Sequence, residues 1–219
     1  MPKVKPIKLR LPPKGALVPN NSDDPLKYYY VPFVGGLYIN RINIALGLLQ
    51  GHYFENVLEI GYGSGVLMPT LCQMSKEVHG VDLGSDPHAI GQRLANLGCY
   101  PKLSPGEPDH LLFDDNSFDL IVTISVLEHI KQIAPFLKEI HRVLKPGGQL
   151  LVGMPAVNKT MGYLFQAIGF PGIDEHHVTS PEEMAAAARP IFELQSVAKL
   201  PSFLPGNIYL YKAFCFRKP

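Results

Sequence analysis

A glycine-rich segment follows directly on a short apolar run and has the composition of a ligand-binding loop. It contains Glu59, Gly61, Tyr62, Gly63 and Gly65, with glycine at alternate positions. Glycine lets the backbone turn sharply and approach a ligand without a Cβ in between. A helix behind the loop would direct its N-terminal amides and its positive dipole end at the same ligand. The segment therefore predicts a site that contacts its ligand through the main chain.

Two common nucleotide-binding patterns are incomplete here. The dinucleotide fingerprint needs glycine or a small substitute at its last position, where this chain has Val66. The loop is also not a P-loop, because no Gly-Lys-Ser/Thr sequence follows it. Val66 in place of the final glycine argues against a nucleotide-dependent oxidoreductase.

Asp82 is the second candidate binding residue. It closes a predicted strand over residues 78–81, at the carboxyl edge of the sheet and beside the glycine loop. A carboxylate at this place can accept hydrogen bonds from both hydroxyls of a ribose. Taken alone, Asp82 is more simply a polar loop residue or a helix cap. Together with the loop, it predicts an adenosine-type ligand across the ends of the first two strands.

Strands and helices alternate along the chain and would place both candidates at one edge of a sheet. Strand-like apolar runs occupy residues 57–60, 78–81, 118–124, 149–154, 192–200 and 208–216, and helical stripes occupy 38–49, 67–74, 86–97, 133–144 and 180–189. Asp86 can cap the third helix, and Ser180 opens a capping box with Glu183. The pattern predicts an α/β three-layer sandwich with a mostly parallel sheet and a C-terminal hairpin.

Five segments together resemble a known family. They are Val57–Gly65, Gly80–Asp82, Leu112–Asp119, Ser125–His129 and Leu137–Val152. Their order and spacing resemble those of class I S-adenosylmethionine-dependent methyltransferases, of the small-molecule type related to ubiquinone and menaquinone biosynthesis enzymes. The resemblance implies S-adenosyl-L-methionine as the cofactor. It also implies a Rossmann-like, seven-stranded sheet whose last strand inserts antiparallel.

The resemblance also assigns cofactor contacts to individual residues. The methionine part of the cofactor would lie beside the glycine loop (Glu59, Gly61, Tyr62, Gly63 and Gly65). Asp82 would bind the ribose, and Leu83 would pack against the adenine. Ser125, just after the fourth strand, would lie beside the methionine moiety; its simpler role is to cap the next helix.

The predicted adenine contact departs from the family pattern. Glu107 and Pro108 stand where the family commonly has Asp-Ala, and Glu107 would accept from the adenine amino group. Glutamate is longer than aspartate, and Pro108 lacks a backbone N–H.

Two histidines are candidate general bases, because imidazole has a pKa near neutrality. His129 stands where the family often has a histidine facing the cleft; a buried, hydrogen-bonded histidine is the non-catalytic alternative. His176 precedes the Ser180 capping box, where similar proteins often carry a histidine that closes over the site. His176 and His177 suggest zinc, but only Glu175 stands at ligand spacing, so no metal is predicted.

The segment over residues 155–175 is apolar and carries little charge. It predicts an acceptor-side insertion that covers a hydrophobic or aromatic small molecule. A helix packed on the sheet is the structural alternative. The aromatic segment Tyr28–Phe33 would form the opposite wall.

Composition bounds the class of protein. The length of 219 residues predicts a single domain, over 26–219. Residues 1–25 are rich in proline and basic residues and predict an N-terminal arm, which is either solvated or laid over that domain. A net charge of +1 argues against nucleic-acid binding. No apolar run is long enough to span a membrane, and no secretory signal is present. Three cysteines outside any CxxC motif predict reduced thiols and a cytoplasmic location.

The sequence thus predicts a methyltransferase that acts on a hydrophobic or aromatic small-molecule acceptor. The alternative is a catalytically silent cofactor-binding or scaffold protein on the same fold, since fold does not fix function.

Overall fold

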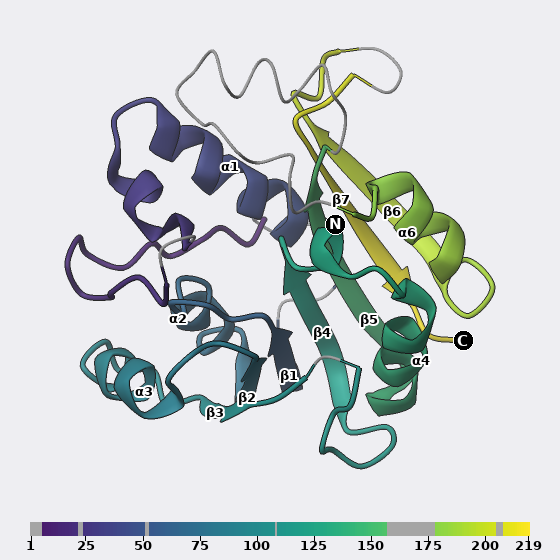
Figure 1. Ribbon diagram of the computed structural model, residues 1–219, viewed down its shortest axis with the longest axis horizontal. Coiled ribbons are helices and arrows are strands. Elements are labelled where there is room, and N and C mark those ends of the chain that lie inside the picture. The colour runs from purple at the N-terminus through teal and green to yellow at the C-terminus, as the bar shows by residue number, and fades with distance from the viewer. Residues whose placement is uncertain (1–5, 22–23, 51–52, 108, 157–177, 205–207) are drawn as a thin grey trace, which may run out of the picture.

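A seven-stranded sheet forms the centre of the protein, with strand order β3-β2-β1-β4-β5-β7-β6 (Figure 1). The computed structural model describes residues 6–21, 24–50, 53–107, 109–156, 178–204 and 208–219. The strands are β1 (Phe54–Ile60), β2 (Ser75–Asp82), β3 (Lys102–Pro105), β4 (Phe118–Ile124), β5 (Leu144–Pro155), β6 (Glu193–Leu200) and β7 (Tyr211–Arg217).

The strand directions confirm the predicted sheet. Strands β3, β2, β1, β4 and β5 pair in parallel, and β7 inserts antiparallel between β5 and β6. Strand β3 was not predicted, because this edge strand has only four residues, is half exposed and ends in a proline. The order in which the strands are added to the sheet reverses between β1 and β4. Open α/β sheets bind ligands at such a point.

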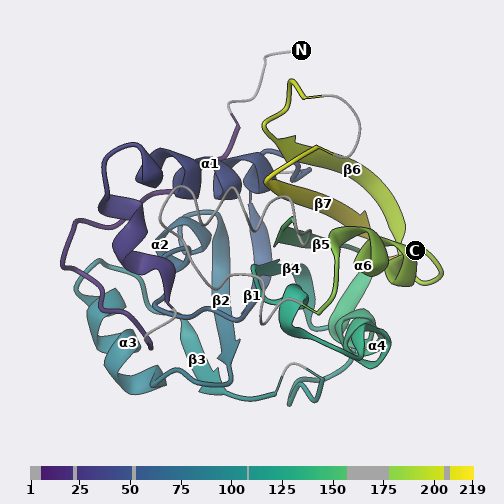
Figure 2. The same ribbon diagram turned by 45° about the horizontal axis from the view of Figure 1, so that its top comes forward.

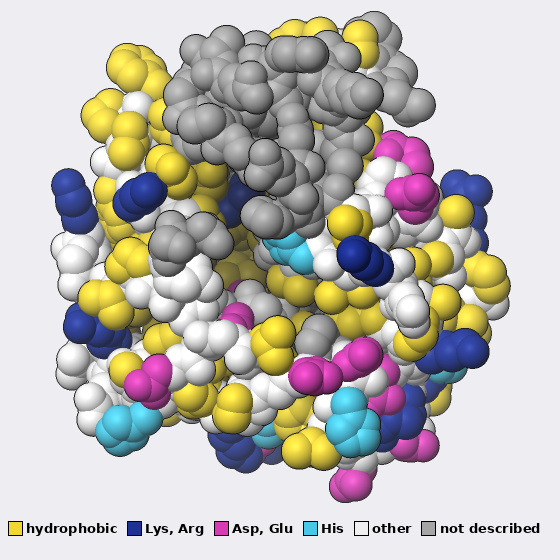
Figure 3. All heavy atoms as spheres, in the orientation of Figure 1, with side chains coloured by type: hydrophobic (Ala, Val, Ile, Leu, Met, Phe, Trp, Pro, Cys, Tyr) yellow, Lys and Arg dark blue, Asp and Glu magenta, His cyan; other side chains and the backbone are white. Residues whose placement is uncertain are grey.

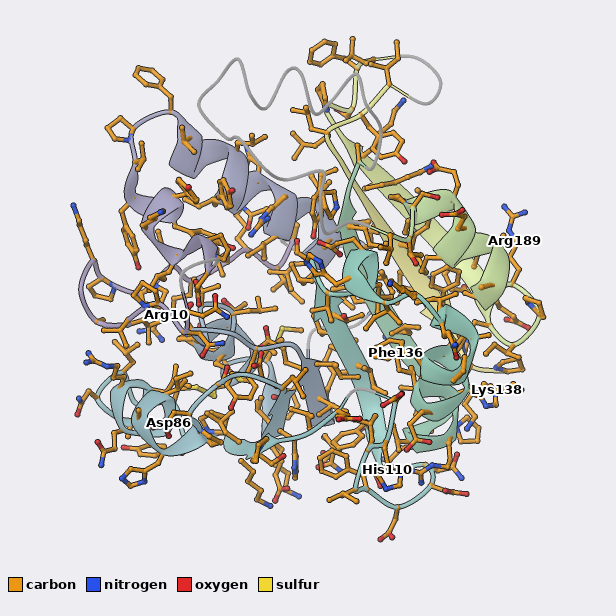
Figure 4. All side chains as sticks on the ribbon, in the orientation of Figure 1. Arg10, Asp86, His110, Phe136, Lys138 and Arg189 are labelled. Carbon is orange, nitrogen blue, oxygen red and sulfur yellow. A yellow bond between two sulfur atoms is a disulfide. The ribbon has the colours of Figure 1, made fainter. Side chains whose placement is uncertain are left out.

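Helices cover both faces of the sheet and complete three layers (Figure 2). Side chains on successive strand positions enter opposite cores; Val57 packs with one and Leu58 with the other. The first core contains residues of α1 (Val34–Leu46), α2 (Met68–Leu71) and α3 (Pro87–Ala95). The second contains residues of α4 (Ile133–Val143) and α6 (Pro181–Ala188), including the fully buried Phe136 (Figure 4).

Both predicted helix caps are confirmed. The Asp86 carboxylate accepts the N–H groups of His88 and Ala89 at the start of α3. Ser180 and Glu183 form the reciprocal capping box of α6. These caps satisfy amides that have no partner within their own helix.

Two predicted boundaries were wrong. The helix behind the glycine loop, α2, is a single turn that begins at Met68, where the Met68 N–H donates to the carbonyl of Gly65. Such a short helix does not supply the dipole expected at the loop. Strand β5 begins at Leu144 rather than residue 149, and a register shift opposite Phe118–Leu120 takes up the Pro-Gly-Gly sequence.

The expectation of three reduced thiols was also wrong. Cys72, at the end of α2, and Cys99, just after α3, form a disulfide with a Cα–Cα distance of 5.9 Å. Cys215 is a buried free thiol. The pair was not evident from spacing, because the two cysteines are 27 positions apart in the sequence and only the packing of α2 beside α3 brings them together.

Residues 6–21 lie against the domain. The backbone N–H of Leu9 donates to Asn43 Oδ1 at 2.8 Å, and that of Arg10 donates to Thr70 Oγ1 at 2.8 Å (Figure 4). Leu17 is buried in the first core. Within the described ranges, no helix has the length and apolar character needed to cross a membrane.

Candidate functional site

Asp82 connects the glycine loop after β1 to the loop after β2. Its Oδ2 accepts the N–H of Gly63 at 2.9 Å, and its Oδ1 accepts the N–H of Gly84 at 2.9 Å. Ser85 Oγ donates to the carbonyl of Gly63 at 3.1 Å, which adds a second bond between the loops. Each carboxylate oxygen retains acceptor capacity, so the group can still bind two hydroxyls.

Gly61 and Gly63 are both required by the conformation of the loop. Gly61 has φ +77°, and a Cβ there would lie 2.2 Å from Val126 Cγ2. Gly63 has φ +51°, in the left-handed region that favours glycine. The Gly61–Val126 approach places the loop directly beside the segment that follows β4.

The other two loop residues, Gly65 and Tyr62, face the protein interior. A Cβ at Gly65 would contact Leu94 and Ile90 of α3 at 3.2–3.3 Å, so glycine here allows close helix packing. Tyr62 is buried against β2, and burial together with the charge of Asp82 raises the pKa of its hydroxyl to about 12. Their positions suit support of the loop rather than direct contact with a ligand.

Glu59 is a buried carboxyl at the end of β1, and its Oε2 has no hydrogen-bond partner among the described residues. Burial, and secondarily the nearby charge of Asp82, raises the pKa of Glu59 well above its ordinary value. A buried polar atom without a partner is costly. A cationic or N–H-bearing ligand beside the loop would remove that cost.

The residues predicted to contact adenine lie at the outer end of the site. Leu83 is 71% exposed beside Asp82, as a surface for a flat ring would be. Glu107 is exposed, two residues beyond β3. Pro108 lies outside the described residues.

Arg41 from α1 enters the site from the opposite side and was not predicted. Its Cζ lies 4.3 Å from the ring centroid of Tyr38, 5.7 Å from that of Tyr29 and 5.8 Å from that of Tyr211. Nη2 donates to Tyr29 OH at 3.1 Å, and Nη1 donates to Ser125 Oγ at 3.4 Å. Its buried Nε has no hydrogen-bond partner among the described residues.

Ser125 joins Arg41 to the end of β4. It has φ +57°, an uncommon conformation for serine that is frequent at functional sites. Its Oγ lies 3.4 Å from Tyr211 OH, and its N–H donates to the carbonyl of Gly153. Its predicted capping role is not observed, because the helical turn η2 (Leu127–His129) has no side-chain cap.

The two histidines have different outcomes. His129, on η2, is exposed, and its backbone N–H donates to the carbonyl of Val126. The adjacent Glu128 is the buried member of the pair, at 1% exposure. His176, His177 and nearly all of the 155–175 segment lie outside the described residues. Among the residues described, no group of His, Cys, Asp and Glu could hold a metal ion.

The predicted and unpredicted residues face the same region at the carboxyl ends of β2, β1 and β4. Figure 3 shows a hollow in the middle of this face, with hydrophobic and acidic side chains around it. A separate cavity of about 350 Å³ is lined by residues such as Arg142 and Lys218. These two cations already donate to protein groups, Arg142 to Glu139 and Lys218 to main-chain carbonyls.

Similar proteins were found by sequence. Residues 58–152 match a family model described as "Methyltransferase domain". A ubiquinone biosynthesis O-methyltransferase of Pseudomonas aeruginosa is 30% identical over 142 residues, which are 62% of this chain and 57% of that protein. Sterol 4-C-methyltransferase strm-1 of Caenorhabditis elegans is 32% identical over 148 residues, which are 60% of this chain and 43% of that protein. The chain thus spans about half the length of these curated relatives.

A similar fold was found among solved structures. The N-methyltransferase NodS from Bradyrhizobium japonicum WM9, in complex with S-adenosyl-L-homocysteine, aligns with a TM-score of 0.63. The alignment covers 91% of this chain and 94% of that chain at 20% identity, so it shows the fold alone.

Residues 58–152 of this chain are therefore similar in sequence to a methyltransferase domain, and the chain has the fold of a methyltransferase structure. The similar proteins include O-, C- and N-methyltransferases. They therefore leave the accepting atom to be inferred from the site.

Proposed function

We propose that this protein transfers a methyl group from S-adenosyl-L-methionine to a hydrophobic or aromatic small-molecule acceptor. The observation that carries the proposal is the Asp82 carboxylate, held between the N–H groups of Gly63 and Gly84 at the ends of β1 and β2. Its fixed oxygens suit a ribose, and exposed Leu83 next to it suits an adenine. The cofactor supplies an electrophilic methyl group on its sulfonium.

The opposite end of the site suits the amino-acid end of the cofactor. Arg41 carries a positive charge with no carboxylate within ion-pair distance among the described residues. We propose that Arg41, with Ser125, binds the cofactor carboxylate, and that Glu59, whose Oε2 has no hydrogen-bond partner among the described residues, faces its ammonium group. Charge-assisted bonds of this kind are stronger than those between neutral groups.

Calorimetric titration with S-adenosyl-L-homocysteine, NAD and 5′-methylthioadenosine tests both ends. We expect S-adenosyl-L-homocysteine to bind and NAD to give no heat. Arg41→Gln should weaken the binding of S-adenosyl-L-homocysteine. It should leave the binding of 5′-methylthioadenosine unchanged, because that ligand has no carboxylate. Heat from NAD alone would contradict the proposed cofactor.

An acceptor screen with labelled cofactor tests the transfer itself. Binding without transfer to any acceptor would instead support the catalytically silent alternative.

No nucleic-acid partner is proposed. The cytoplasmic location stays a prediction, and thiol counting in fractionated cells tests it, because a persistent Cys72–Cys99 bond is typical of an oxidising compartment.

A further inference from the structure

Glu128 is a buried carboxyl group that the proposed cofactor contacts do not use. Its Oε2 has no hydrogen-bond partner among the described residues. Its main-chain carbonyl accepts the N–H groups of Val178 and Thr179 at 2.7 and 3.2 Å, so η2 is fastened to the segment before α6. The structure therefore fixes the backbone of Glu128 and leaves one buried side-chain oxygen without a hydrogen-bond partner among the described residues.

The order of the strands places Glu128 beyond the methionine end of the site. Asp82 follows β2, Glu59 ends β1 and Ser125 follows β4, in the spatial order of the sheet. Glu128 lies three residues past Ser125, close enough to Arg41 and Tyr211 for their charges to interact. Tyr211 begins β7, which pairs with β5, so Glu128 stands on the β5–β7 side of the proposed cofactor.

Tyr211 reaches over β5 from this side. A Cβ at Gly153 would lie 2.4 Å from Tyr211 OH, so only glycine lets the ring take this position. The Tyr211 hydroxyl then lies 3.4 Å from Ser125 Oγ. The aromatic face and the Glu128 carboxyl thus border the same side of the site.

We propose that Glu128 accepts the proton of an aromatic hydroxyl while that oxygen is methylated. This inference rests on the proposed methyl transfer. The hydroxyl O–H bond breaks and its proton passes to Glu128 Oε2 as a new O–C bond forms to the methyl carbon. The C–S bond breaks at the same time, and its electron pair remains on sulfur, which leaves an aryl methyl ether, S-adenosyl-L-homocysteine and a neutral Glu128.

The surroundings of Glu128 favour proton uptake. The effect of burial exceeds the lowering effects of its own backbone N–H and of Arg41, so the pKa of Glu128 is raised to about 8. A carboxylate of this basicity is a better proton acceptor for a weak acid than an exposed one. Among the described residues, the charged or titratable groups near it are Arg41 from α1, Tyr211 from β7 and the exposed His129 on η2 itself.

The same surroundings favour a phenol over an amine. The guanidinium of Arg41 already places a positive charge against the rings of Tyr29, Tyr38 and Tyr211. A protonated amine would bring a further positive charge beside Arg41 and beside the sulfonium. A phenol instead offers a flat ring to Tyr211 and an oxygen that becomes negative as it loses its proton.

The test uses 4-nitrophenol as a probe of the S-adenosyl-L-homocysteine complex, because its phenolate absorbs in the visible range. We expect the bound probe to ionise about one pH unit or more below its midpoint in solution, since a neutral Glu128 donates a charge-assisted hydrogen bond to the phenolate. Glu128→Gln should remove most of this shift. Glu193→Gln, an exposed glutamate on β6, is the matched control and should retain it.

Separate measurements distinguish the possible failures. If S-adenosyl-L-homocysteine does not bind, the proposed function fails. If it binds with wild-type affinity to Glu128→Gln and that variant keeps the full shift, only the role of Glu128 is overturned. Tighter binding of benzylamine than of the phenol would overturn the acceptor class. Where a phenol is methylated, Glu128→Gln should slow the transfer by about 10²-fold or more.

Discussion

The carboxylate of Asp82 and the backbone N–H of Gly63 form a 2.9 Å hydrogen bond across the ends of β2 and β1. The bond has two consequences for binding. It holds the glycine loop in the conformation that a ligand would meet, and it fixes the carboxylate oxygens before the ligand arrives. Preorganisation of this kind lowers the entropy that binding must overcome.

Replacement of Asp82 by alanine should therefore weaken binding of S-adenosyl-L-homocysteine by about 1–3 kcal/mol, since two ribose hydroxyls lose a charged acceptor. Asp86→Ala is the matched control. It removes the α3 cap and should cost about 1 kcal/mol of stability with little effect on binding. Calorimetry and thermal unfolding of both variants check this; equal affinities for Asp82→Ala and wild type would place the cofactor pocket elsewhere.

The glycine loop offers a second test. Gly61→Ala should weaken both folding and cofactor binding, because its Cβ would lie 2.2 Å from Val126 Cγ2 at φ +77°. Adding Val126→Ala should recover part of the stability by removing the clash, while the backbone strain remains.

Gly63→Val should abolish binding, because a branched side chain would occupy the face where the backbone meets the ligand.

A glycine in open space provides the control for these variants. A Cβ at Gly36, within α1, would meet nothing within 4 Å. Gly36→Ala should therefore stabilise the protein by about 1 kcal/mol through helix propensity and leave binding unchanged. Chemical denaturation of the set separates the effects; a Gly61→Ala variant as stable as wild type would contradict the close approach to Val126.

The local part of the site could be predicted from the sequence. The Gly61–Gly65 loop and Asp82 each follow a strand that was evident from its apolar run, and parallel strands end at the same edge of a sheet. Their pairing therefore followed from topology. The roles of Gly65 and Tyr62 did not, because the loop pattern does not show which positions face α3 or β2.

The long-range part could not be predicted. Arg41 and Ser125 are 84 residues apart, and only the packing of α1 on the strand ends brings them together. One signal was present, since Arg41 is the single charged residue of α1. A lone cation in an otherwise uncharged helix needs a partner, but nothing in the sequence identifies Tyr29, Tyr38 and Tyr211 as the rings around it.

The buried carboxyls predict how stability depends on pH. Burial raises the pKa of Glu128 to about 8 and also raises that of Glu59, so the folded protein binds protons more tightly than the unfolded chain. Stability from Glu128 is then fully present below about pH 4.5 and is lost as pH rises towards 8, by about 1.4 kcal/mol per unit at most. Glu128→Gln should flatten this part of the profile, measured by urea unfolding of the free protein from pH 5 to 8.5. A wild-type profile that rises with pH across this window, with no change in the variant, would contradict the buried position of Glu128.

The last prediction concerns the disulfide between α2 and α3. Cys72 and Cys99 are 27 positions apart and close a loop that contains β2, with Asp82 at its end, and all of α3. Closing a loop of this length restricts the unfolded chain, and the chain-entropy model gives about 3–4 kcal/mol of stabilisation. Because the bond also joins the two helices behind the Gly63–Asp82 contact, its loss should loosen the loop and weaken binding of S-adenosyl-L-homocysteine.

Thermal unfolding with and without a dithiol reductant measures the effect. The reductant should lower the melting temperature of wild type but not that of the Cys72→Ala/Cys99→Ala variant. Cys215→Ala is the matched control, because this buried thiol forms no disulfide and the variant should respond to reductant as wild type does. Thiol titration of the denatured, unreduced protein should find one free thiol. Three free thiols in protein purified without reductant would show that the bond does not form in solution.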